Sequence, residues 1–160
     1  MKYEILEKDI IYDTLRFNFF VKQPKQTAFC IQMGHYDSNI GRDKNDSDTN
    51  MELSCQLSPS MEMFIDDLFF VPTIPGLSSS NYYYSFWIGG KMYAEGPISM
   101  FPQVGRLSEV VEDNLSPIFM SHPKLLLCQQ LFYVTVENFG VNNPIELIVV
   151  LRGKISRSIQ

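Results

Sequence analysis

Residues 131–153 read LFYVTVENFGVNNPIELIVVLRG, and this stretch decides the expected fold class. Apolar and mixed positions alternate along 131–137, which is the two-residue period of a β-strand. Residues 145–152 carry apolar side chains on both parities, so we expect this second strand to be covered on two faces. Asn, Gly and Pro between the strands suit a turn. The stretch therefore predicts a hairpin, ending at Gly153, at the centre of a β-sheet protein.

Composition points to the same fold class. The chain has 160 residues, which suits one domain. It contains only two alanines but 12 Phe and 8 Tyr, and this balance favours strands over helices. The net charge of −5 without a basic patch argues against nucleic acid as the main partner. No apolar run is long enough for a membrane span, and the charged start lacks the apolar core of a signal peptide, so we expect an intracellular origin and no membrane partner.

The three cysteines lie far apart, at Cys30, Cys55 and Cys128. Their number is odd, and Cys30 and Cys128 have apolar neighbours. This pattern favours buried free thiols, no disulfide and a reducing compartment.

Further strands follow from the same periodicity. A bulge is expected at Asp66–Asp67, where the alternation changes parity. Gly89–Gly90 joins two aromatic stretches and suits a tight hairpin turn. A short helix is expected at 107–115, behind Ser108 as a possible N-cap. We therefore expect one all-β domain, residues 1–160, folded as an antiparallel, jelly-roll-like β-sandwich with one short helix. The expected strands are 14–22, 28–33, 51–57, 61–71, 82–88 and 91–95, besides the two already described.

Residues 34–50 interrupt this pattern with a polar stretch rich in turn formers. We expect a loop that protrudes and contributes little to stability. Its acidic residues at 43–50 resemble a calcium loop but lack the glycine and the distant bidentate acid of that motif. A solvated loop is the favoured interpretation.

No catalytic, metal or cofactor motif stands out. The only histidines are His35 and His122, too few for a metal centre on such a scaffold. Adjacent residues of a strand face opposite sides, so Asp66 and Asp67 do not make a catalytic pair. We therefore expect neither a cofactor nor an enzyme.

Two groups of residues remain as candidates for binding. The aromatic hairpin could stack sugars, although core and interface roles explain it as well. Apolar residues on the outward parity of their strands suggest an interface, unless a helix or loop of the same chain covers that face. The possible stacking residues are Tyr82, Tyr84 and Trp87, and the interface candidates are Ile148, Val150, Phe20, Phe69 and Tyr83.

The second half of the chain, from Pro72 onward, resembles the closing part of single jelly-roll virion proteins of tailed bacteriophages and related viruses. The features that carry this resemblance are the Gly89–Gly90 aromatic hairpin, the helix at 107–115, PKLLL at 123–127, TVEN at 135–138 and the last strand at 147–153. The resemblance implies a capsid-decorating, head-vertex or connector-associated component without an active site.

These observations predict a structural component of a virus particle, made in the host cytoplasm and located in the virion. It would act by self-association and by docking on other virion proteins. The alternative is a carbohydrate- or receptor-binding β-sandwich module that uses the aromatic hairpin. A hydrolase is disfavoured because no triad or ligand set is present.

Overall fold

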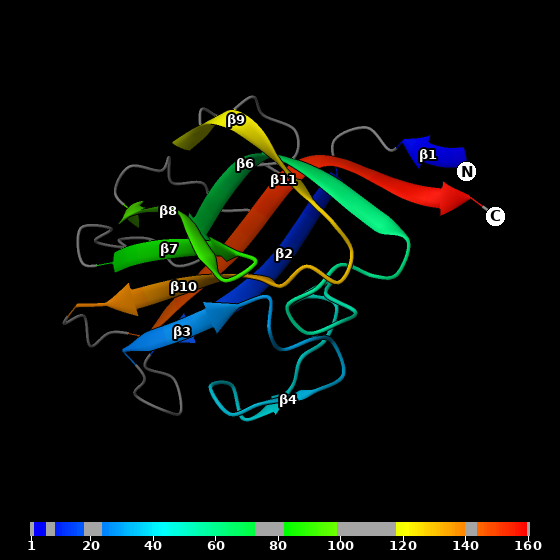
Figure 1. Cartoon of the computed structure of the whole chain (residues 1–160). Coiled ribbons are helices and arrows are strands. Elements are labelled where there is room, and N and C mark those ends of the chain that lie inside the picture. The colour runs from blue at the N-terminus through cyan, green and yellow to red at the C-terminus, as the bar shows by residue number, and fades with distance from the viewer. Residues whose placement is uncertain are drawn as a thin grey trace.

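The computed structural model describes residues 2–5, 9–17, 24–72, 82–98, 118–139 and 144–159. It is nearly all β, with antiparallel sheets that pack face to face, so the predicted all-β sandwich is confirmed. Figure 1 shows the two layers and a separate small ribbon below them.

Five strands form one layer, which we call the long sheet. Its order is β1-β11-β6-β9, and β2 pairs with β11 on the same side as β1. β11 is therefore the central strand, as its two apolar parities require. The strands are β1 (Lys2–Ile5), β2 (Asp9–Phe17), β6 (Met61–Pro72), β9 (Ile118–Leu126) and β11 (Ile145–Ile159).

Four strands form the other layer, the short sheet, in the order β3-β10-β7-β8. The β7–β8 hairpin turns at Gly89 and Gly90, both with positive φ, so this predicted hairpin is confirmed. The strands are β3 (Lys25–Ala28), β7 (Tyr82–Ile88), β8 (Lys91–Pro97) and β10 (Phe132–Asn138), and a ribbon of β4 (Tyr36–Asp37) with β5 (Arg42–Asp43) lies apart.

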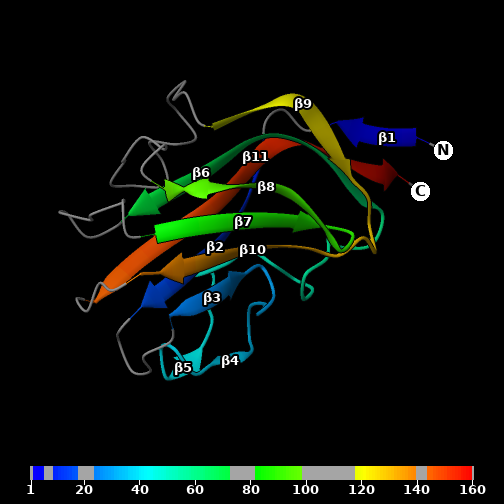
Figure 2. The same ribbon diagram turned by 60° about the vertical axis from the view of Figure 1, so that its left-hand side comes forward.

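The predicted hairpin of 131–153 is wrong. β10 pairs with β3 and β7 in the short sheet, whereas β11 pairs with β1, β2 and β6 in the long sheet. The stretch therefore passes from one layer to the other, as Figure 2 shows for the two crossing strands. Periodicity identified both strands, but turn-forming residues serve a crossover between sheets as well as a hairpin.

Gly153 does not end the last strand, which continues to Ile159. The pairing register shifts there, between Arg152 and Gly153 on β11 and between Ile65 and Asp67 on β6. The predicted bulge near Asp66–Asp67 is thus confirmed. A Cβ added at Gly153 would lie 1.8 Å from the carbonyl oxygen of Phe64, so only glycine permits this close approach.

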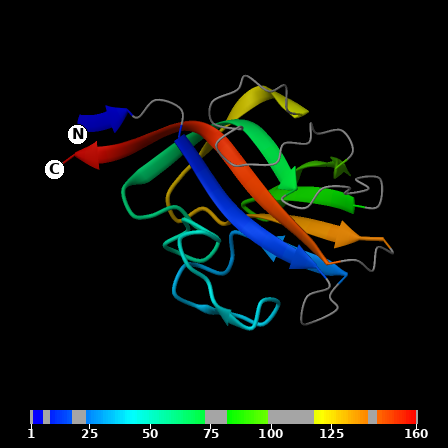
Figure 3. The same cartoon turned by 180° about the vertical axis from the view of Figure 1, so that it is seen from behind.

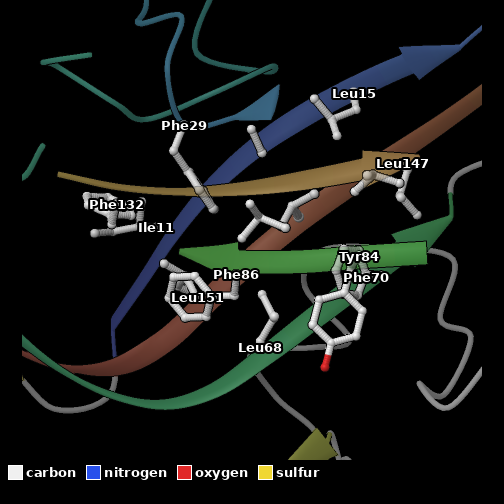
Figure 4. Close-up of a cluster of buried hydrophobic side chains, with 14 of the residues drawn as sticks. Ile11, Leu15, Phe29, Leu68, Phe70, Tyr84, Phe86, Phe132, Leu147 and Leu151 are labelled. Atoms are coloured by element: carbon white, nitrogen blue, oxygen red, sulfur yellow. The ribbon is translucent and has the colours of Figure 1, made fainter. Parts of the chain in front are cut away.

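The core lies between the two sheets. Along β7 the side chains alternate between buried and half-buried, so one face of this strand enters the core. Figure 4 shows Phe70 and Tyr84 side by side in this layer, and their ring centroids are 5.2 Å apart. Residues of both sheets fill the rest of the core, including Ile11, Leu15, Leu68, Phe86, Phe132, Leu147 and Leu151.

Local strand predictions differ from the structure in part. The first strand begins at Asp9 instead of residue 14, and residues 18–22 of that prediction lie outside the described part. The next strand runs at 25–28 instead of 28–33. Residues 51–57 form turns with a single bridge between Leu53 and Gln56, and Met51 and Leu57 anchor them in the core. The helix predicted at 107–115 lies outside the described residues.

The prediction of free thiols is wrong for two of the three cysteines. Cys30 and Cys55 form a disulfide, whereas Cys128 is free. The chain leaves strand geometry after Ala28, and Phe29 and Cys55 both have positive φ. These turns bring the two cysteines together. The predicted strands at 28–33 and 51–57 would have kept them apart.

Candidate interaction surface

Val150, on the outer face of the long sheet, is covered within the chain, which corrects this interface candidate. This side chain has no exposed surface and clusters with Val71, while Ile10, Tyr12 and Ile148 pack around the two. Ile148 is only half-buried and forms the margin of the cluster. Val150, on the outward face of β11, is therefore buried by residues of the same chain. Cover from within the chain was the alternative to an interface in the sequence analysis. Phe20 and the side chain of Phe69 lie outside the described part.

The outer face of the short sheet carries an exposed apolar and aromatic group. Tyr133 is paired with Trp87, and Trp87 is paired with Met92, so three strands place these residues in one row. Leu131 precedes Tyr133 by two residues and is 50% exposed, and Met92 is 46% exposed. We call Leu131, Tyr133, Trp87 and Met92 the outer patch. Figure 2 shows β7 and β10, which carry the middle of the row, side by side.

The two aromatic rings at the centre of the outer patch are nearly parallel. Their centroids are 6.1 Å apart and their planes differ by 17°. The next row along the strands is polar, because Ser85 is paired with Thr135 and with Glu95. An apolar centre with a polar border is the composition of a protein interface and also of a sugar-stacking platform.

Tyr83, another interface candidate, lies on the same outer face and is half-buried. It is paired with Glu137 on β10. Partial desolvation raises the pKa of its hydroxyl, and the charge and hydrogen bond of Glu95 raise it further. Tyr83 therefore belongs to the polar border of the outer patch.

Tyr82 and Tyr84 are wrong as stacking residues, because both side chains are buried in the core. Phe17 packs edge-on against Tyr82, and the ring of Phe70 is tilted against that of Tyr84. Burial raises the pKa of Tyr82 to about 12. Only Trp87 of the three candidates faces outward, since strand parity separates it from the two tyrosines.

The polar segment that the sequence predicted to protrude is packed against β2, which corrects that prediction. We call residues 36–50 the clasp; Figure 3 shows it beside β2. Five of its side chains are buried, which the polar sequence gave no reason to expect. They are Asp37, Ile40, Lys44, Asp48 and Thr49.

The clasp satisfies the outward backbone groups of β2. Tyr12 N–H donates to the side chain of Asn50, at 2.9 Å, and the Tyr12 carbonyl accepts from the Thr49 hydroxyl, at 3.0 Å. The side-chain amide of Asn50 donates to the Ile10 carbonyl at 3.0 Å, and Lys44 donates to the Thr14 carbonyl at 3.3 Å. An open strand edge would otherwise expose these groups to other chains.

Ion pairs of two buried carboxylates, Asp13 and Asp48, hold the clasp in place. Lys44 Nζ lies 2.5 Å from Asp13 Oδ1, and Asp48 lies 2.7 Å from Arg16 and 2.8 Å from Arg42. Burial raises the pKa of Asp13, although Lys44 opposes this shift. Burial also acts to raise the pKa of Asp48, but hydrogen bonds from Arg42, the Asn45 backbone and Arg16 outweigh it and lower the pKa to about 2.

Sequence reasoning missed this cluster, yet one signal was present. Asp13 has the same strand parity as Ile11, Leu15 and Phe17, which all enter the core. A carboxylate on a buried parity needs a cation brought to it. That cation is Lys44, from the segment that was taken for a free loop.

The described residues contain no cluster of metal-binding side chains. No three His, Cys, Asp or Glu side chains among them gather closely enough to hold a metal ion. Asp48, part of the calcium-like sequence, already binds two arginines. A cavity of about 210 Å³ lies beside the clasp, and its polar lining residues include Asn50, Glu52 and Gln56.

Within the described ranges, no helix is long and apolar enough to cross a membrane.

Comparison with known proteins adds no relative to this description. No protein-family model, no curated protein and no solved structure matches the chain.

Proposed function

We propose that this chain is a structural component of a virus particle that acts by self-association and by docking on the shell. The observation that carries the proposal is the outer patch, where Trp87, Tyr133, Met92 and Leu131 gather on the outer face of the short sheet. Aromatic residues and methionine are enriched at the centres of protein interfaces. The virion setting rests on the resemblance of the second half of the chain to jelly-roll virion proteins.

Self-association is tested by a charge placed in the outer patch. Met92→Glu should shift the protein from oligomer to monomer in sedimentation velocity, because the new carboxylate loses its hydration in the interface. Met33→Glu is a matched control, since Met33 is 45% exposed and Met92 46%, and Met33 lies outside the patch. Both variants should remain folded and unfold in one cooperative thermal transition. A wild-type protein that stays monomeric at high concentration contradicts the proposal.

The virus setting needs its own test. Genes for capsid or tail proteins should lie beside the gene of this chain. Quantitative mass spectrometry of purified particles should then find many copies per particle. A chain that is produced in infected cells but absent from purified particles is not a structural component.

A second function is favoured by one observation, the nearly parallel rings of Trp87 and Tyr133. A sugar ring can stack on such a surface through its C–H groups, while Ser85, Thr135 and Glu95 offer hydrogen-bonding partners at the border. A glycan array separates the two functions. Carbohydrate binding that is lost in Trp87→Ala and kept in Met33→Glu supports the binding module.

A further inference from the structure

β2 is one edge of the long sheet in the described part of the chain. Its partner is β11, and its other side meets the clasp. In an antiparallel edge strand, every second residue directs its backbone groups away from the sheet. In β2 the outward carbonyls that accept hydrogen bonds belong to Ile10, Tyr12, Thr14 and Arg16.

Side chains, not a strand, satisfy most of these groups. The one bridge between the clasp and β2 joins Asp13 to Thr49. The donors to Ile10 and Thr14 are the side chains of Asn50 and Lys44. The outward backbone groups of β2 therefore have the spacing needed to pair with a complete antiparallel strand.

The opposite edge of the long sheet is β9, which pairs with β6 among the described strands. Each neighbouring pair in the order β2-β11-β6-β9 is antiparallel, so β2 and β9 run in opposite directions. A second copy placed beside β2 would therefore present its β9 in the antiparallel direction. The two edges of this sheet are compatible with each other in successive copies.

The disulfide brackets the clasp. Cys30 and Cys55 are 25 positions apart, and residues 36–50 lie between them. Both cysteines are half-buried, so small reagents can reach this region. Cross-linking the ends of a segment reduces the number of open conformations available to it.

We propose that the edge of β2 is a docking site for strand β9 of a second copy, and that the Cys30–Cys55 disulfide keeps the clasp closed over this site. A dithiol reductant transfers two electrons and two protons to the bridge, which gives two cysteine thiols and an oxidised, cyclic reductant. The clasp then opens more often and exposes the strand edge. Contact between two different edges is heterologous, so it extends to a chain of subunits unless the rotation closes a ring.

This site is separate from the outer patch, and the exchange measurement does not depend on the patch. The amide hydrogen of Tyr12 bonds to the Asn50 side chain, so its exchange reports opening of the clasp. Reduction should speed this exchange by about tenfold or more. Ser47→Ala is the control, since it removes an exposed side chain that bonds only within the clasp and should leave the exchange unchanged. Unchanged exchange after reduction overturns the role of the disulfide.

Docking is tested with reduced Asn50→Ala protein, in which the clasp is weakest. In the Met92→Glu background, which removes association through the outer patch, it should associate in sedimentation experiments, while oxidised Ser47→Ala in the same background should stay monomeric. With benzoylphenylalanine in place of Tyr12, a mixture of ¹⁴N- and ¹⁵N-labelled chains should cross-link position 12 to residues 118–126 of the other isotopic form. Cross-links to any other strand, or a reduced Asn50→Ala protein that remains monomeric, overturn the proposal.

Discussion

Lys44 Nζ lies 2.5 Å from Asp13 Oδ1, and the two side chains are 2% and 0% exposed. Asp13 also accepts hydrogen bonds from the backbone N–H groups of Phe29 and Thr14. A buried carboxylate with three donors is satisfied, but it becomes costly when its cation is removed. The pair therefore makes the clasp part of the folded core, although the clasp is polar in sequence.

Lys44→Met should lower the free energy of unfolding by about 3–5 kcal/mol, because it leaves the Asp13 carboxylate buried without its cation. Urea unfolding at pH 7 measures the change. Lys91→Met is the control, since Lys91 is exposed at the start of β8 and should change the stability by less than about 0.5 kcal/mol. A small effect of Lys44→Met would mean that the clasp contributes little to stability.

The cost of Lys44→Met should depend on pH in a defined direction. Burial raises the pKa of Asp13 above its ordinary value of 3.8, and Lys44 works against that rise, so the substitution raises the pKa further. The penalty is complete above the folded-state pKa and disappears as the pH falls through it, because the folded protein then binds a proton. The stability deficit should therefore shrink as the pH is lowered from 7. A deficit that stays constant down to the pH at which the wild type unfolds contradicts a charged Asp13 as its cause.

The sequence predicted those features of the fold that depend on residues close together in the chain. Gly89–Gly90 specified a hairpin between adjacent strands, and the change of parity at Asp66–Asp67 specified a bulge. Partners that are distant in sequence left no such mark. Lys44 is 31 positions from Asp13, and the turn residues after β10 are the same whether β11 returns to the same sheet or crosses to the other.

The outer patch was predictable in part. Strand parity places Trp87 on the face opposite to Tyr82 and Tyr84. Once the two tyrosines are assigned to the core, Trp87 is the one residue of the three that faces outward. Its neighbours Tyr133 and Met92 come from two other strands, and their alignment depends on registers that the sequence did not specify.

Acid should loosen the clasp through Asp48. Its folded pKa of about 2 lies below the ordinary 3.8, so its stabilisation is complete above pH 3.8 and is lost as the pH falls towards 2. Asp48→Asn should cost roughly 2 kcal/mol at pH 6, and the difference from wild type should shrink at lower pH. Unfolding curves between pH 6 and pH 2.5 measure this. Asp46→Asn, at an exposed position of the clasp, is the control and should change the stability by less than about 0.5 kcal/mol.

Gly153→Ala should destabilise the sandwich by about 3 kcal/mol or more, since the new methyl group would overlap the Phe64 carbonyl oxygen. That oxygen belongs to the backbone of β6, so relief requires β6 and β11 to separate at the bulge. Ser156→Ala, three residues further along β11, is the control and should have little effect. Thermal unfolding of both variants decides the matter; equal melting temperatures would show that the strands move apart at little cost.

The disulfide should be detectable by counting thiols and by measuring stability. Unreduced protein in denaturant should react with a thiol reagent at one cysteine, Cys128, and reduced protein at three. The bridge joins residues 25 positions apart, so its loss should lower the free energy of unfolding by about 3 kcal/mol through the greater entropy of the open unfolded chain. The double variant Cys30→Ser with Cys55→Ser should match the reduced protein, and Cys128→Ser should keep one bridge. Three reactive thiols in the unreduced protein would restore the reading of the sequence as a chain without disulfides.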